Sequence, residues 1–190
     1  MAETPSPVFD AVLARRSYSK VTPETPTTAE VERLLEAAAT MPDHAGLAPW
    51  RVIEVRGAAR ERLGDALAAA AERAGHGADA AASQRAKPLR AELLIAIVAG
   101  YRESEKVERW EQDVAAAGVA HALALLLDDA GWGVMWRSGH LTRTPEVAAM
   151  HGLGPDEALL GWLYVGGRPG GTRRERHATV DLAARHTVLG

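Results

Sequence analysis

Arg15, Arg16 and Ser17 stand in a row where a short N-terminal helix is expected to end. Two guanidinium groups and a hydroxyl within three residues can hold a phosphate through paired, charge-assisted hydrogen bonds. The same arginines could instead complement the negative end of the helix dipole. The sequence leaves both roles open.

Two further places gather useful side chains. In Trp136-Arg137-Ser138-Gly139, tryptophan offers a stacking face, arginine and serine offer hydrogen-bond donors, and glycine permits close approach of a ligand to the backbone. The alternative is a strand that ends in a turn. His44 lies in a proline-flanked loop over residues 42–49, where it could contact the edge of a cofactor or simply face solvent.

Composition narrows the chemistry. The chain contains no cysteine, so disulfides, thiolate catalysis and thiolate metal sites are excluded, and any redox reaction must use a bound cofactor. The seven histidines show no His-Glu-x-x-His spacing, and we expect no metal. Segment 166–171 is glycine-rich but is interrupted by Pro169, so neither a Rossmann fingerprint nor a phosphate loop is present.

Charge and hydrophobicity exclude two classes of partner. A net charge of −3 argues against a general nucleic-acid binder, although the basic tail over 168–176 keeps a nucleic-acid-binding helical protein as a remote third reading. The longest apolar runs fall far short of the ~20 residues that cross a bilayer. Residues 1–20 lack the apolar stretch of a secretory signal. We expect a cytoplasmic protein.

The elements that must position these residues follow from periodicity and capping signals. Helices are expected over 7–16, 27–41, 58–74 and 144–152, with a short helix and a mobile connection over 78–90, and strands over 50–56, 92–100, 132–137 and 159–166. Irregular alternation of helices with four strands predicts an α+β or three-layer α/β fold in a single domain, 1–190.

The segment over 105–131 predicts a long helix that is apolar around its whole circumference after a charged start. A lone chain of this length has difficulty enclosing such a helix. Packing against its symmetry mate in a homodimer would supply the missing cover. The glycine- and arginine-rich tail over 167–190 is expected to lie along another subunit or along the domain surface.

Together these pieces resemble the nitroreductase family of flavin-dependent oxidoreductases, over most of the chain up to about Pro169. Four matches in order carry the resemblance: residues 15–17, residues 41–50, residues 106–112, and residues 136–139 followed by 160–166. The resemblance implies an α/β/α sandwich with a central, mainly antiparallel sheet. It also implies a homodimer with two FMN molecules at the interface.

By analogy with the family, Arg15, Arg16 and Ser17 hold the ribityl phosphate and the pyrimidine side of FMN. The Pro-Asp-His loop of the partner chain covers the isoalloxazine, so His44 acts in trans. Trp136, Arg137 and Ser138 line the other side, and the backbone near Gly139 is placed to donate to flavin N5. No catalytic side chain is implied.

The family loop often carries two amide side chains where this sequence has Gly46 and Ala48, so the flavin contact they make is absent and His44 is a candidate substitute. For the phosphate, the tail offers Arg168, Arg173, Arg174 and Arg176 without a way to choose. The implied activity is ping-pong hydride transfer through FMN, from NADH or NADPH to a small-molecule acceptor such as a nitroaromatic or a quinone. The alternative is a protein that stores or sequesters FMN with little turnover.

Overall fold

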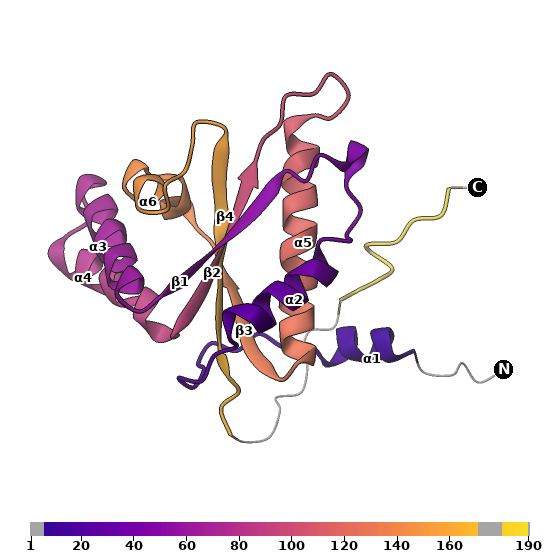
Figure 1. Cartoon of the computed structure of the whole chain (residues 1–190), viewed down its shortest axis with the longest axis horizontal. Coiled ribbons are helices and arrows are strands. Elements are labelled where there is room, and N and C mark those ends of the chain that lie inside the picture. The colour runs from indigo at the N-terminus through magenta and orange to yellow at the C-terminus, as the bar shows by residue number, and fades with distance from the viewer. Residues whose placement is uncertain (1–5, 171–179, 190) are drawn as a thin grey trace.

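A four-stranded antiparallel sheet forms the centre of the computed structural model, which describes residues 6–170 and 180–189 (Figure 1). The strands are β1 (Trp50–Arg56), β2 (Leu93–Gly100), β3 (Trp132–Arg137) and β4 (Glu157–Gly167), and their spatial order is β1-β2-β4-β3. Every neighbouring pair runs antiparallel. The four expected strands are confirmed, and β3 lies at an edge of the sheet.

Helices cover both faces of this sheet. One layer consists of α3 (Ala58–Arg73), α4 (Ala78–Ala86) and α6 (Pro145–Met150), and the other contains α2 (Thr28–Ala38) and α5 (Arg109–Asp129). The sequence of β2 is continuously apolar because both of its faces are buried. One face (Leu94, Ala96 and Val98) belongs to the core beneath α3. The other (Leu93, Ile95 and Ile97) belongs to the core beneath α5. The three-layer α/β/α expectation is confirmed.

Local capping explains where several helices begin. Thr27 and Glu30 form the expected capping box at the start of α2, whose Val31 and Ala38 are buried. α1 (Pro7–Ala14) begins after Ser6 with Pro7 in its first turn, but the Ser6 side chain makes no capping hydrogen bond. None of the residues of α1 is buried in the single chain.

Residues 78–90 differ from the mobile connection expected for part of this segment. α4 is followed by a short 3-10 helix over Pro88–Arg90, and both Ala81 and Pro88 are buried. A Cβ atom on Gly64 of α3 would collide with the backbone carbonyl of Arg85, so the absence of a side chain lets α4 lie directly against α3. Close packing of α4 against α3 therefore holds residues 78–90 in place. The weak amphipathicity of this segment did not predict that packing.

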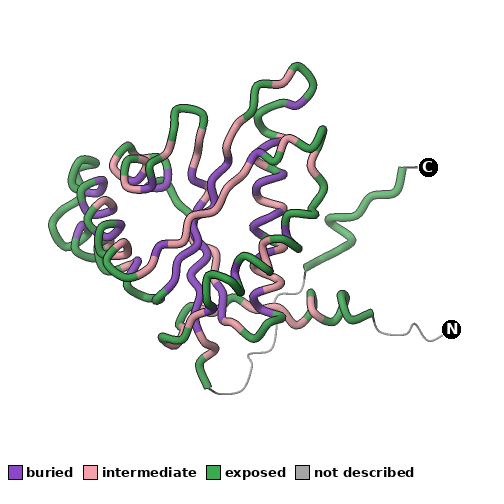
Figure 2. Tube along the Cα trace, in the orientation of Figure 1, coloured by how far each residue is buried: buried purple, intermediate pink, exposed green. Residues whose placement is uncertain are grey.

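α5 begins at Arg109, later than expected, because Glu108 serves as its N-cap and pairs with Glu111 in a capping box. Its inner side is buried (Figure 2). Trp110 and Val114 are 66% and 62% exposed. One chain therefore does not enclose this helix. None of the helices in the described residues is long and apolar enough to cross a membrane.

Candidate functional site

The segment that follows α1 lies along β3, the edge strand of the sheet. The backbone N–H of Tyr18 donates to the carbonyl of Val134 at 3.0 Å, and that of Thr22 donates to Gly167 at 2.9 Å. These bonds place Arg15, Arg16 and Ser17 against β3, at the end of α1 where the sequence placed them.

A first pocket, which we call the arginine pocket, has a volume of about 200 Å³. It is lined by Arg15, Arg16, Ser17, His121, Ala124, Val134 and Trp136. The ring of His121, on α5, lies 4.9 Å from the ring of Trp136 between centroids. No carboxylate is among the lining residues, so the pocket combines positive charge, a hydroxyl and an aromatic wall, as a phosphate-bearing ligand requires.

The two arginines divide the roles that the sequence left open. Arg16 donates to the carbonyl oxygens of Leu13 at 2.7 Å and Arg15 at 2.9 Å, and so satisfies the C-terminal end of α1. Arg15 makes a longer contact of 3.4 Å with the hydroxyl of Ser17. Arg15 and Ser17 thus provide hydrogen-bond donors to the pocket, while Arg16 stabilises the end of α1 that carries them.

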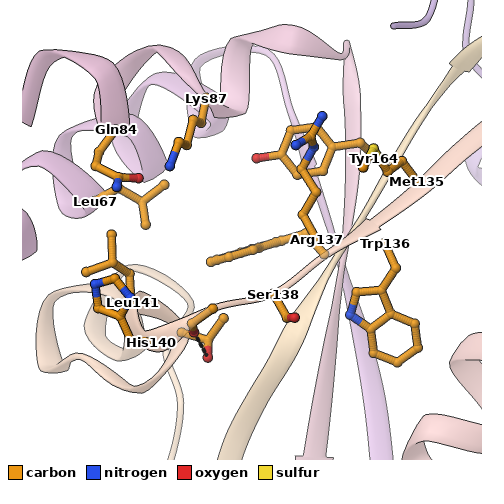
Figure 3. A pocket seen from close by; sticks show the side chains of 13 residues that line it. Leu67, Gln84, Lys87, Met135, Trp136, Arg137, Ser138, His140, Leu141 and Tyr164 are labelled. Atoms are coloured by element: carbon orange, nitrogen blue, oxygen red, sulfur yellow. Dashed lines mark hydrogen bonds between the residues drawn. The ribbon is translucent and has the colours of Figure 1, made fainter. Parts of the chain in front are cut away.

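A second pocket, the strand-end pocket, lies between α4 and the residues that follow β3 and has a volume of about 380 Å³ (Figure 3). The predicted residues Trp136, Arg137, Ser138 and Gly139 line it, together with Leu67, Gln84, Lys87, Met135, His140, Leu141, Thr142, Trp162 and Tyr164. Trp136 of the edge strand β3 lines both pockets, one on the α3 side of the sheet and the other on the α5 side.

The strand-end pocket is electropositive. Figure 3 shows Gln84 of α4 and Lys87, the residue that follows α4, on one side and Arg137 on the other. The Arg137 guanidinium lies 5.2 Å from the centre of the Tyr164 ring, and its Nε is buried without a hydrogen-bond partner. The lining includes no carboxylate to neutralise these cations.

Burial raises the pKa of Tyr164 to about 12, so its hydroxyl stays protonated near neutral pH and can donate a hydrogen bond. Arg137 Nε is buried without a partner, and such a donor is costly unless a ligand supplies an acceptor. The lining of Lys87, Arg137 and Tyr164 therefore suits a planar ring with electron-rich atoms on one edge.

Gly161 allows the end of β3 to approach β4 so closely. Its φ is +147°, and a Cβ there would lie 2.5 Å from the carbonyl oxygen of Arg137 and 2.6 Å from Nε1 of Trp136. The pairing with β2 is irregular at the same place, because Ile97 pairs with Gly161 and Val98 with Leu159, which leaves Leu160 of β4 as a bulge. The backbone irregularity thus positions the residues that line both pockets.

The structure does not bring His44 into either pocket of its own chain. Its Nδ1 lies 2.9 Å from Oε2 of Glu111 near the start of α5, and this hydrogen bond lowers the pKa of Glu111. His121 lies ten residues further along α5, about 15 Å by helix geometry. A role for His44 in trans stays a prediction.

The loop that contains His44 is held by its own backbone. The N–H of Ala48 donates to Oδ2 of Asp43 at 2.6 Å, and both Ala45 and Ala48 have positive φ. Neither Gly46 nor Ala48 provides an amide side chain, which agrees with the departure from the family pattern.

Among the tail arginines, Arg168 is engaged elsewhere. It forms an ion pair of 3.1 Å with the buried Asp128 on α5, and its guanidinium lies 5.6 Å from the centre of the Tyr18 ring. Arg173, Arg174 and Arg176 lie outside the described residues. The choice of a phosphate ligand from the tail therefore stays open.

The pocket residues that sequence reasoning missed include Gln84, Lys87, His121 and Tyr164. Lys87 carried the only available signal, because lysine is rare in this chain. The other three occur in apolar or alanine-rich segments that indicate packing alone.

Comparison with known proteins shows the family to which the chain belongs. Residues 12–167 match the sequence profile of the Nitroreductase family. The Escherichia coli (strain K12) protein named "Putative NAD(P)H nitroreductase YdjA" is 34% identical over 158 residues, which cover 83% of this chain and 86% of that protein. A "Putative NAD(P)H nitroreductase" of Haemophilus influenzae is 26% identical over 167 residues, 87% of this chain and 90% of that one.

Solved structures show the same fold. A nitroreductase-like family protein from Bacillus cereus superposes with a TM-score of 0.81 at 23% identity, covering 100% of this chain and 99% of that one. The FMN and NADPH-dependent nitroreductase NfnB from a strain named sphigopyxis sp. HMH gives a TM-score of 0.75 at 19% identity, covering 95% and 98%. The matched profile and the relatives together show that the chain belongs to the nitroreductase family and is an oxidoreductase.

Proposed function

We propose that the chain binds FMN along the end of β3 and uses electrons from NADH or NADPH to reduce electron-poor small molecules such as nitroaromatics and quinones. The observation that carries the proposal is the pair of carboxylate-free, cationic pockets that share Trp136 in their linings. FMN has a phosphate at one end, which suits the arginine pocket, and a planar ring at the other, which suits the strand-end pocket. The names of the relatives, NAD(P)H nitroreductases and an FMN and NADPH-dependent enzyme, support the same proposal.

A buried hydrogen-bond donor in the strand-end pocket also fits FMN. Arg137 Nε is buried without a partner in the strand-end pocket, where a ring oxygen or nitrogen would accept its hydrogen bond. Trp162 and Tyr164 provide an apolar, aromatic wall for a planar ligand.

Each group then has a distinct task. Arg15 and Ser17 hold the phosphate, while Arg16 keeps the end of α1 in place. Lys87 and Arg137 would stabilise negative charge at the pyrimidine edge of the ring, and the backbone N–H near Gly139 would donate to N5. Bound FMN supplies the capacity to accept a hydride from the nicotinamide and to pass electrons to the acceptor. No side chain is required as a general acid or base.

A second copy of the chain completes the site in this proposal, with residues 1–190 forming one domain. α1 exposes Val8 and Phe9, and α5 exposes Trp110 and Val114, so both helices carry apolar area that a partner subunit would cover. The partner's loop would then bring its His44 to the flavin.

Titration with FMN and with riboflavin tests the binding half of the proposal. We expect tighter binding of FMN, because only FMN presents a phosphate to Arg15 and Ser17. Steady-state assays with NADH or NADPH and a nitroaromatic acceptor test the catalytic half. Stoichiometric FMN without turnover would favour the storage protein, and a protein that takes up no FMN would contradict the proposal altogether.

A further inference from the structure

Trp162, in the wall of the strand-end pocket, is connected to a buried titratable group that the proposed reaction does not use. Its indole Nε1 donates to Nε2 of His151 at 3.0 Å, and the Nδ1 of His151 lies 2.8 Å from the carbonyl oxygen of Val147. His151 and Trp162 are only 7% and 5% exposed. This chain of two hydrogen bonds joins the core beside α6 to the pocket.

The two bonds define the protonation state of His151. A carbonyl oxygen can only accept, so Nδ1 carries the hydrogen, and Nε2 must be free of hydrogen to accept from the indole. Protonation would place a second N–H opposite the indole N–H. Trp162 would then lose its acceptor and would have to shift within a closely packed wall.

The groups around His151 oppose its protonation. Burial lowers the pKa of His151, the hydrogen bond to the carbonyl of Val147 raises it in part, and the positive charge of Arg51 on β1 lowers it again, so the pKa stays below its ordinary value. The two nearby carboxylates are already paired, Glu157 of β4 with Arg51 and Glu146 of α6 with Arg73 of α3. No free carboxylate among the described neighbours is placed to stabilise a charged imidazole.

We infer that His151 is a positioning residue: its neutral form holds Trp162 in the ring-binding wall, and its protonation weakens the binding of planar, flavin-like ligands in the strand-end pocket. The ligand class rests on the proposed function. Linkage fixes the sign, because a ligand that requires neutral His151 binds less tightly as pH falls through the pKa of that residue in the free protein.

The test measures riboflavin binding to the purified protein between pH 7.5 and 5.0. Riboflavin carries the ring without the phosphate, so the titration of the phosphate cannot contribute. We expect its Kd to rise severalfold, toward the limit of about tenfold that a shift of one pKa unit in His151 on binding would give below both pKa values. His151→Gln keeps a donor and an acceptor without titrating, so its Kd should stay nearly constant with pH. The matched control His186→Gln, at an exposed histidine, should retain the rise.

Tryptophan emission gives a second reading that does not depend on flavin. A pH transition in the ligand-free wild type that is missing in His151→Gln and in Trp162→Phe supports the inference, even if the protein binds no flavin and the proposed function fails. Equal pH dependence of emission and of riboflavin binding in wild type and His151→Gln would overturn it.

Discussion

Positive charge without nearby carboxylates distinguishes the side chains around the end of β3. Arg15 and Arg16 line one pocket, and Lys87 and Arg137 line the other. Arginine provides a planar set of donors that matches phosphate, whereas lysine provides a single compact charge. The chain thus places its forked donors where a phosphate is expected, and a mixed set where a ring edge is expected.

Replacing Arg15 with alanine should weaken FMN binding by about 1.5 to 3 kcal/mol, the range for a hydrogen bond to a charged group. Fluorescence titration of the flavin-free protein measures the change. Riboflavin binding should change far less, because it lacks the phosphate. Arg33→Ala, at an exposed position on α2, is the matched control and should leave both affinities unchanged. Unchanged FMN affinity in Arg15→Ala would contradict the proposal that the phosphate of FMN binds in the arginine pocket.

The ion pair between Arg51 and Glu157 should make the free energy of unfolding decrease as pH falls into the acid range. Hydrogen bonding to Arg51 lowers the pKa of Glu157 from 4.5 to about 2. A depressed carboxyl pKa stabilises the fold above the unfolded-state value and loses that contribution as pH falls toward the folded-state value. Glu157→Gln should therefore be less stable than wild type at pH 7 and equally stable near pH 2. Urea unfolding across this range measures it, and parallel curves for the two proteins would refute the coupling.

At the scale of elements, the sequence predicted the four strands and the order of the helices because each has a strong local signal. β2 is a continuous apolar run, and α2 carries a capping box. The positions of Arg15 and Trp136 were also predictable, since each follows or ends such an element.

Residues that depend on packing between elements were not predictable. Lys87 reaches the strand-end pocket only because α4 packs against α3, and His121 meets Trp136 only because α5 crosses β3. The His151–Trp162 hydrogen bond likewise needs the turn between α6 and β4. Nothing in the local sequence encodes these pairings, so periodicity alone could not find them.

Gly161 on β4 should be intolerant of any side chain. A Cβ there would collide with the backbone of Arg137 and with Trp136, and the φ of +147° adds strain. Gly161→Ala should destabilise the fold by about 2 to 4 kcal/mol and should weaken flavin binding. Gly77→Ala, where nothing lies within 4 Å and φ is −65°, is the control and should change stability by less than about 0.5 kcal/mol. A stable Gly161→Ala protein with normal flavin affinity would show that the close approach is unimportant.

At the scale of the whole molecule, apolar side chains remain uncovered beside α5. Figure 1 places α1 and residues 180–189 on the side of α5 away from the sheet. Phe9 is 61% exposed and Leu189 is 92% exposed. Large apolar side chains exposed on one side of the molecule favour an interface between copies of the chain.

Light scattering coupled to size exclusion should accordingly give twice the mass of one chain. Val114→Glu places a charge on the exposed face of α5 and should shift the population to the monomer, with weaker FMN binding because the site loses its second chain. Ala37→Glu, on the exposed side of α2, should leave the dimer intact. A monomeric wild type that binds FMN tightly would refute a site shared between subunits.

The central claim, that this chain binds FMN and reduces it with a nicotinamide, is tested most directly by one spectrum. The purified protein, reconstituted with FMN, is mixed anaerobically with NADH or with NADPH while the visible flavin bands are followed. We predict bands that bleach with at least one donor and return when a nitroaromatic or a quinone is added. Bands that persist with both donors would contradict the account.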